Sequence, residues 1–456
     1  MNFPAKPWLV LLCLGPPAWA QDAATRPAIQ TQRWEEDWSV LADPALRTGP
    51  FDAGKYVPLT GNAYLSFGAN LRERVEALDA LQFGTLRQKS NAYLLDRAEI
   101  DLDLHWDGWE AFVQLEDDRA LGKTRITAAD ADRFDVEEAF VAHTGPIGDG
   151  ALKLRVGRQE FGFDRQRFVS SRDGPNVRQP FDALWADYEL GDWRIISFAA
   201  HPVQTRDQAA FDDGSSHALV LDGFRVERRA LGPGNLAVYY LRYERAEAQF
   251  PGASGNEQRN ALDLHYNGRV GAIDFDLEAM GQQGQIGGRP VLAWAFGQRT
   301  GYTFAGTRWN PVVSLQFDAA SGNTSRTRSF ETFNPLFPNG SYFNLAGLTG
   351  DANLLHVKPA VSIAPDPTLQ IALALGLQWR QTTRDATYTF PVQPIANTAG
   401  RGSPWSAAYA QLDATKKLND NLALSFELAR YQVGASIRQA RGRNATYASV
   451  QASLAW

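Results

Sequence analysis

The chain has 456 residues, of which 44% are hydrophobic and 21% charged, and its net charge is −6. This length suits two or three soluble domains or one large barrel, and the negative charge argues against a nucleic-acid partner, which favours a basic surface. No stretch holds the roughly 18 to 20 uninterrupted apolar residues that a membrane-spanning helix needs, which excludes a multi-helix membrane protein.

The first twenty residues have the pattern of a secretory signal. Lys6 precedes an apolar run from Trp8 to Leu14, and Ala18-Trp19-Ala20 forms a small-x-small cleavage site. We therefore predict a signal peptide over 1–20, which exports the chain. The only cysteine, Cys13, lies inside this signal, so we expect neither disulfides nor thiol catalysis in the mature chain.

Residues 21–58 are predicted to form an N-terminal periplasmic segment, in which Thr31 to Leu46 can fold as a short amphipathic helix. The segment is too short for a large plug domain. The chain's six histidines are scattered, and no metal-binding spacing is present, so the sequence predicts no metal site and no cofactor.

From about Asn62 onward, apolar and polar residues alternate, which is typical of strands with one apolar and one wet face. The clearest example runs from Ala98 to Trp106, where Ile100, Leu102 and Leu104 alternate with acidic residues. We predict about eighteen strands over 59–456, each close to the length that crosses a membrane at a tilt. They are centred near 68, 100, 113, 139, 155, 186, 197, 222, 239, 263, 277, 294, 315, 359, 374, 411, 426 and 451.

Every second predicted connection is a tight turn built from turn-forming residues. The connections between them are expected to be long and polar, for example 77–92, 117–133, 159–182, 201–216, 319–353 and 380–404. Short periplasmic turns alternating with long outer loops are typical of a transmembrane barrel. The tight turns are Asp107-Gly108, Gly191-Asp192, Leu231 to Asn235, Asn267-Gly268-Arg269, Pro365-Asp366-Pro367 and Asn419-Asp420-Asn421.

Aromatic residues and the chain end indicate the same fold. Trp106 and Trp109 flank the first tight turn, as interfacial rings do at a membrane boundary. The last strand ends on Trp456, which resembles the C-terminal insertion signal that barrel-insertion machinery reads. The predicted fold class is all-β: a transmembrane antiparallel up-and-down β-barrel of bacterial outer membranes, contacting lipid outside and water inside.

The predicted lumen face is densely charged. Opposite charges across a water-filled lumen bind polar solutes, although each such charge can also simply pair with a neighbour and hold the wall together. The candidates for a pore or substrate site on the strands are Arg72, Arg74, Arg97, Glu137, Glu138, Arg155, Asp187 and Arg194.

The predicted loop over 159–182 is rich in arginine, whose planar donor fork matches carboxylates. It is the best candidate for binding an anionic ligand. The alternative is a solvated loop with local ion pairs. Its candidate residues are Arg165, Arg167, Arg172, Asp173 and Arg178. The aromatic-rich stretch 330–343 is expected to fold inward or across the mouth, where its rings either stack on sugars or pack within the loop.

Three stretches resemble the alginate export family of outer-membrane proteins: Arg33 to Trp38 running on to Leu59, Gly157-Arg158-Gln159 with Ser171 to Arg178, and Phe333 to Pro338. The resemblance implies an eighteen-stranded barrel that releases an anionic exopolysaccharide through a loop-gated, arginine-rich constriction. Carried over by position, Arg158, Arg74 and Glu138 would line that constriction. One departure is Glu137, where the alginate exporter has arginine, and it puts alginate itself in doubt as the substrate.

Two transport hypotheses follow. In the first, the chain is a passive channel for an anionic polysaccharide or oligosaccharide and depends on a periplasmic polymer-delivery complex. In the second, it is a substrate-selective porin importing small organic acids or sugars. A barrel enzyme is a weaker alternative, because no Ser–His–Asp arrangement stands at a suggestive spacing.

Overall fold

The computed structural model describes residues 26–86, 91–324, 326 and 328–456. The expected signal sequence, 1–20, lies outside the described residues. No helix in the described part of the chain is both long enough and apolar enough to span a bilayer.

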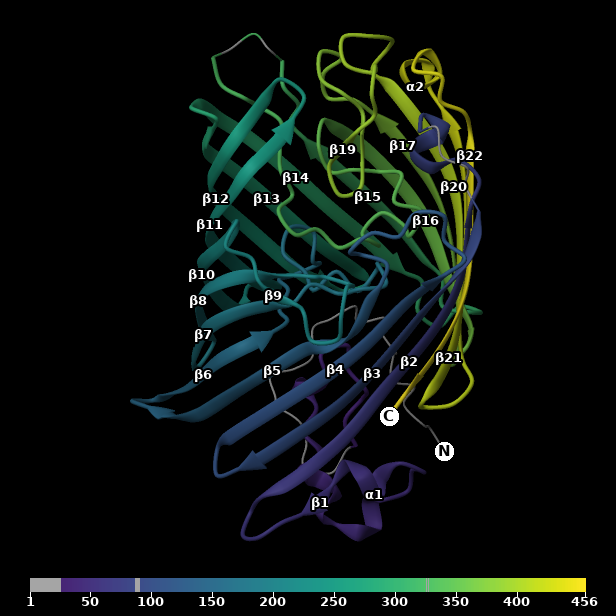
Figure 1. Cartoon of the computed structure of the whole chain (residues 1–456). Coiled ribbons are helices and arrows are strands. Elements are labelled where there is room, and N and C mark those ends of the chain that lie inside the picture. The colour runs from purple at the N-terminus through teal and green to yellow at the C-terminus, as the bar shows by residue number, and fades with distance from the viewer. Residues whose placement is uncertain (1–25, 87–90, 325, 327) are drawn as a thin grey trace.

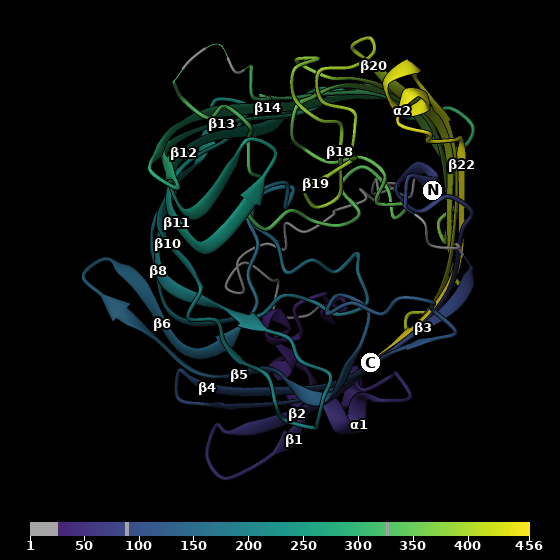
Figure 2. The same ribbon diagram turned by 45° about the horizontal axis from the view of Figure 1, so that its top comes forward.

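The chain folds into a closed antiparallel barrel of eighteen long strands, each hydrogen-bonded to its neighbours in chain order (Figures 1 and 2). The first long strand pairs with the last, Val75 facing Val450, which closes the sheet into a barrel. The barrel strands are β2 (Tyr64–Leu78), β3 (Ala92–Trp106), β4 (Trp109–Leu121), β5 (Asp132–Ile147), β6 (Gly150–Gln159), β7 (Phe181–Leu190), β8 (Trp193–Gln204), β10 (Leu219–Leu231), β11 (Gly234–Phe250), β12 (Ala253–Val270), β13 (Ile273–Ile286), β14 (Arg289–Thr303), β15 (Val312–Ala320), β16 (Leu354–Asp366), β17 (Leu369–Trp379), β20 (Trp405–Lys417), β21 (Leu422–Val433) and β22 (Ala445–Ala455).

The predicted fold class is confirmed, and every predicted strand centre falls inside one of these strands. Alternation sets which face each residue takes. On β12, Leu262 and Leu264 are 60% and 50% exposed on the outside, whereas Asp263 and His265, which alternate with them, are buried inside. The outer face is therefore apolar, as contact with hydrocarbon requires.

Placing a charge on this outer face is expected to destabilise the barrel. Leu262→Arg should lower the free energy of unfolding by about 2 to 4 kcal/mol, the cost of an arginine near the bilayer midplane. Gln258→Arg is the matched control, because Gln258 shares the same face of β12 four residues nearer the end of the strand. Urea titration of both variants in lipid vesicles measures the difference, and equal losses would contradict the assigned membrane position.

The tight turns gather at one end of the barrel. Asp107 and Gly108 join β3 to β4 with φ of 46° and 81°, the left-handed conformation that a two-residue hairpin turn requires. One predicted turn is misplaced: Asn267-Gly268-Arg269 lies within β12, which pairs through to Val270. The turn falls instead at Gly271-Ala272, because pairing with β13 continues for two residues beyond the Asn-Gly pair.

Not every connection at the opposite end is long. Two residues, Pro251 and Gly252, join β11 to β12, and Gly287 and Gly288 join β13 to β14. These four strands continue as tall hairpins beyond their neighbours (Figure 1). The expected alternation of short and long connections therefore fails at these two positions, where extended pairing replaces a loop.

The N-terminal segment does not form the expected amphipathic helix over Thr31 to Leu46. The carboxylates of Asp37 and Asp43 accept hydrogen bonds from Ser39 N and Ala45 N, and each thereby starts a new short turn. The segment forms the 3-10 helices η1 (Arg33–Glu35), η2 (Trp38–Ala42) and η3 (Pro44–Leu46), then α1 (Asp52–Lys55). The remaining short elements are β1 (Val57–Pro58), η4 (Leu81–Gly84), β9 (Gly214–Ser215), β18 (Tyr388–Thr389), β19 (Gln393–Pro394) and α2 (Ala435–Gln439).

Two long connections fold into the lumen (Figure 2). We call residues 160–180 the first inward loop and residues 321–353, as far as they are described, the second inward loop. The two loops join at Val169 and Phe337, where Phe337 N donates to Phe168 O at 2.9 Å. Their rings share one buried apolar cluster with inward-facing wall residues such as Tyr239 and Leu241. This cluster fills the lumen beside β7 to β14.

Candidate functional site

A polar cavity of about 610 Å³ remains in the other half of the lumen. It is bounded by wall strands β2, β3 and β20 to β22, by both inward loops and by residues 29–33 of the N-terminal segment. Its charged lining residues are Arg33, Arg72, Arg74, Arg97, Asp173, Arg178, Asp413 and Glu427.

Arginines form one wall of this cavity. Arg72 and Arg74 lie on the inward face of β2, and Arg97 faces Arg72 across the β2–β3 pair. Arg178 comes from the first inward loop. The alternation of β2 places its even-numbered polar residues inside while Leu71 and Val75 face outward.

Two of these arginines hold the first inward loop. Arg97 donates to Asn176 O at 2.7 Å, to Pro175 O at 2.9 Å and to the Asp173 carboxylate at 2.7 Å. Arg72 donates to Asp173 O at 2.9 Å and to Pro175 O at 2.8 Å. Burial would raise the pKa of Asp173, but Arg97 and Arg72 hold that pKa well below its usual value, so the carboxylate stays ionised. Arg97 and Arg72 therefore act mainly as anchors of the loop.

Arg178 links the same loop to the N-terminal segment. Its guanidinium forms an ion pair with Glu160, lies 3.5 Å from Glu137, and donates to Thr31 O at 3.3 Å. Glu138 accepts a hydrogen bond from Glu160 N at 2.7 Å. Glu137 and Glu138 are both buried and do not line the cavity.

Arg74 differs from its neighbours because it anchors no loop in the described structure. Its Nε lies 2.7 Å from Glu76, and the residue lines the cavity. It also belongs to a polar row that crosses four strands, since Thr415 faces Ser425, Ser425 faces Gln451 and Gln451 faces Arg74. An anion in this row meets one arginine and a series of hydroxyl and amide groups.

A parallel row lies two residues farther toward the end with the long loops. Asp413 faces Glu427, Glu427 faces Ser449, and Ser449 faces Glu76. The rows are about 7 Å apart, given a rise of about 3.3 Å per residue. A cationic and hydroxyl row on this part of the wall is thus followed by an acidic row. These residues of β20 to β22 were not among the predicted site residues, although their alternation with apolar residues is visible in the sequence.

Several predicted site residues lie away from this cavity. Arg155 packs under Trp34 of the N-terminal segment, its guanidinium carbon 3.9 Å from the ring centre. Asp187 and Arg194 form an ion pair with each other at 2.6 Å. Arg158 shares the outer face of β6 with Leu154 and Val156, and donates to Asp182 at 3.0 Å. Arg158 and Arg74 are therefore not brought together.

The other loop arginines divide by role. Arg167 is buried and joins the first inward loop to Asp351 of the second, at 2.8 Å. Arg172 lies over the ring of Phe337, and burial lowers its pKa to about 10. Arg165 is half-buried. The prediction that 330–343 folds inward is confirmed, but Phe330, Phe333 and Phe337 are buried in the apolar cluster, so their faces meet protein.

A protein-family model described as alginate export matches residues 63–451. Among solved structures, OccAB1 of Acinetobacter baumannii is similar at 11% identity, covering 89% of this chain and 99% of its own, with a TM-score of 0.59. OccK2 (OpdF) of Pseudomonas aeruginosa, crystallised in complex with glucuronate, is 11% identical and covers 86% of this chain and 96% of its own, with a TM-score of 0.56. These likenesses show the fold. No curated protein matches the chain.

Proposed function

The chain belongs to the alginate export family of outer-membrane β-barrel proteins, and from this premise we propose that it is a passive channel for an anionic polysaccharide or oligosaccharide rich in uronate. Family and fold are those of outer-membrane channels. The substrate is part of the proposal. So are the N-terminal signal for export and one expected partner, a periplasmic complex that delivers the polymer.

The observation that carries this proposal is the polar row from Thr415 to Arg74. A uronate chain offers a carboxylate and several hydroxyls per sugar, and the row offers one guanidinium beside hydroxyl and amide groups. The acidic row beyond it repels carboxylates, so an anion is attracted without being trapped. Conduction needs this balance between entry and release.

A porin for small uronates is the second candidate. The cavity of about 610 Å³ falls within the usual size of small-ligand sites, roughly 300 to 1,000 Å³. The same fold in OccK2 was crystallised with glucuronate, a small uronate. This candidate needs no delivery complex in the periplasm.

Conductance of the purified protein in planar bilayers tests both candidates. A polymer channel should be blocked by mannuronate and galacturonate oligomers more strongly as their length increases, and little by neutral oligomers. A porin for small solutes should prefer the monomer. A barrel that conducts no ions in the presence or absence of these sugars contradicts both.

Arg74→Gln is expected to reduce the preference for anions. Unit charges about 4 to 8 Å apart at an effective dielectric constant of about 20 interact by roughly 2 to 4 kcal/mol before screening by salt. We therefore expect the anion-to-cation permeability ratio, measured by reversal potentials, to fall about threefold to tenfold. Arg430→Gln is the matched control, because Arg430 is exposed on the outer face of β21. Equal effects of the two variants would exclude Arg74 from the pathway.

A further inference from the structure

The connection from β8 to β10 passes the loop-side ends of β6 and β7 and reaches back to β5. We call residues 205–216 the strap. β5 pairs with β6 only from Ala139 onward, so residues 132–138 of β5 have a strand partner on one side only, β4. The first inward loop leaves the wall at this point, and the strap lies against the exposed edge. Such an edge leaves backbone groups that need partners.

Several contacts fasten the strap to β5. Phe211 N donates to Phe134 O at 3.2 Å, and the two rings pack with centres 5.3 Å apart. Asp213 N donates to the Asp135 carboxylate at 3.1 Å. The strap therefore replaces the missing strand partner and closes the wall beside the inward loop.

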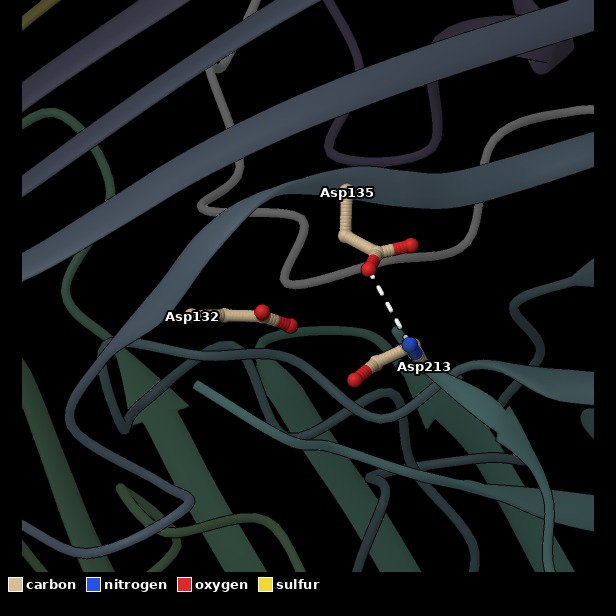
Figure 3. A group of neighbouring side chains, drawn as sticks. All are labelled: Asp132, Asp135 and Asp213. Atoms are coloured by element: carbon tan, nitrogen blue, oxygen red, sulfur yellow. Dashed lines mark hydrogen bonds between the residues drawn. The ribbon is translucent and has the colours of Figure 1, made fainter. Parts of the chain in front are cut away.

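Three carboxylates meet where the strap touches the strand (Figure 3). Asp132 and Asp135 come from β5 and Asp213 from the strap, and their ligand oxygens lie within 4.8 Å of one another. Asp132 is fully buried and points at the other two, yet neither of its oxygens meets a hydrogen-bond donor among the described residues. A buried carboxylate without a partner is costly.

The surroundings do not supply the missing positive charge. Asp118 and Glu116 of β4 face Asp132 and Asp135 directly and add negative charge. Arg158 lies 3.9 Å from the Asp135 carboxylate, but it already donates to Asp182 and to Val136 O. Arg97 lies 3.9 Å from Asp118, on its far side, and is engaged by the inward loop. The negative charge of the three aspartates is therefore not balanced by a free cationic side chain among the described residues.

We propose that Asp132, Asp135 and Asp213 bind a divalent cation, Ca²⁺, which fastens the strap to the barrel wall. Ca²⁺ prefers carboxylate and carbonyl oxygens, accepts irregular geometry and keeps water in its remaining positions. The group offers no nitrogen or sulfur ligand of the kind that zinc and copper prefer. The site requires neither transport hypothesis, so it stands or falls separately from the channel function.

Calcium binding to the full-length protein in detergent, first stripped with EDTA, tests the proposal. Isothermal titration calorimetry should show one site, with a dissociation constant in the range of about 10⁻⁴ to 10⁻³ M typical of extracellular modules. Added calcium should raise the unfolding temperature. Asp213→Asn and Asp132→Asn should each weaken binding by at least about tenfold, because each removes a charged ligand.

Asp207→Asn is the matched control, since Asp207 lies on the same strap and pairs with Arg133 instead. It should bind calcium as the unmodified protein does. The proposal is overturned if the unmodified protein shows no calcium binding, or if Asp213→Asn and Asp132→Asn bind as tightly as Asp207→Asn. It is also overturned if Asp132→Asn raises the unfolding temperature while calcium has no effect, because the carboxylates would then share a proton.

Discussion

Replacing Arg97 by leucine is expected to release the first inward loop and raise the conductance of the channel. Arg97 is fully buried and makes three hydrogen bonds to residues 173–176 of that loop. Removing a buried cation while its anionic partners remain destabilises the folded arrangement by about 3 to 5 kcal/mol of free energy. That amount is enough to shift the loop from almost always docked to frequently undocked.

Single-channel recordings measure this effect as a larger mean conductance with new slow steps between levels. Arg119→Leu is the control, because the exposed side chain of Arg119 on β4 pairs with Asp117, and only its backbone oxygen, which the substitution keeps, accepts a hydrogen bond from Asn176 of the loop. Limited proteolysis should cut the first inward loop faster in Arg97→Leu than in the control. If conductance and cleavage both stay unchanged, the loop is held by other contacts and the assigned role of Arg97 is wrong.

Replacing Arg167 by leucine is expected to separate the two inward loops and destabilise the filled half of the lumen. Arg167 is 1% exposed and pairs with Asp351 at 2.8 and 3.2 Å, with Asp318 of β15 3.9 Å away. The variant leaves two buried carboxylates without their cation, so we expect a loss of about 3 to 5 kcal/mol in the free energy of unfolding. Denaturant titration followed by tryptophan fluorescence measures it.

A double variant separates this pairing from simple loss of packing. Asp351→Leu added to Arg167→Leu removes one unpaired carboxylate, so the double variant should be more stable than Arg167→Leu alone. Arg165→Leu, two residues earlier on the same loop, should have little effect, because Arg165 is only half-buried and no ion pair involves it in the described structure. A double variant that is less stable than the single one would contradict the pairing.

The barrel could be predicted because membrane and water impose a period of two on every strand. The polarity of each residue, such as apolar Leu262 and charged Asp263, indicates whether it faces lipid or the lumen, and no contact with a distant part of the chain is needed to infer this. Turn positions were harder to place. The Asn267-Gly268 pair resembles a turn, yet pairing with β13 continues through it, because the register of two whole strands outweighs a local turn preference.

The site could be predicted only in part, because inward loops are placed by contacts far apart in sequence. The charge pattern identified Arg72, Arg97 and Arg178, but it could not show that Arg72 and Arg97 bind backbone carbonyls of the inward loop, or that Arg178 pairs with Glu160. Arg158 was expected beside Arg74. In the structure, Arg158 instead shares the outer face of β6 with Val156 and donates to Asp182. The aspartate group joins positions about eighty residues apart, which no local motif reveals.

The tall hairpins of β11 to β14 have a practical consequence. Their strands have 14 to 18 residues, more than the roughly 9 to 11 that cross hydrocarbon, so the tips stand clear of the bilayer. Gly287 and Gly288 form one tip with φ of 54° and 80°, where added chain disturbs little beyond the turn. A short epitope tag inserted there should be displayed on living cells and bound by antibody without permeabilisation.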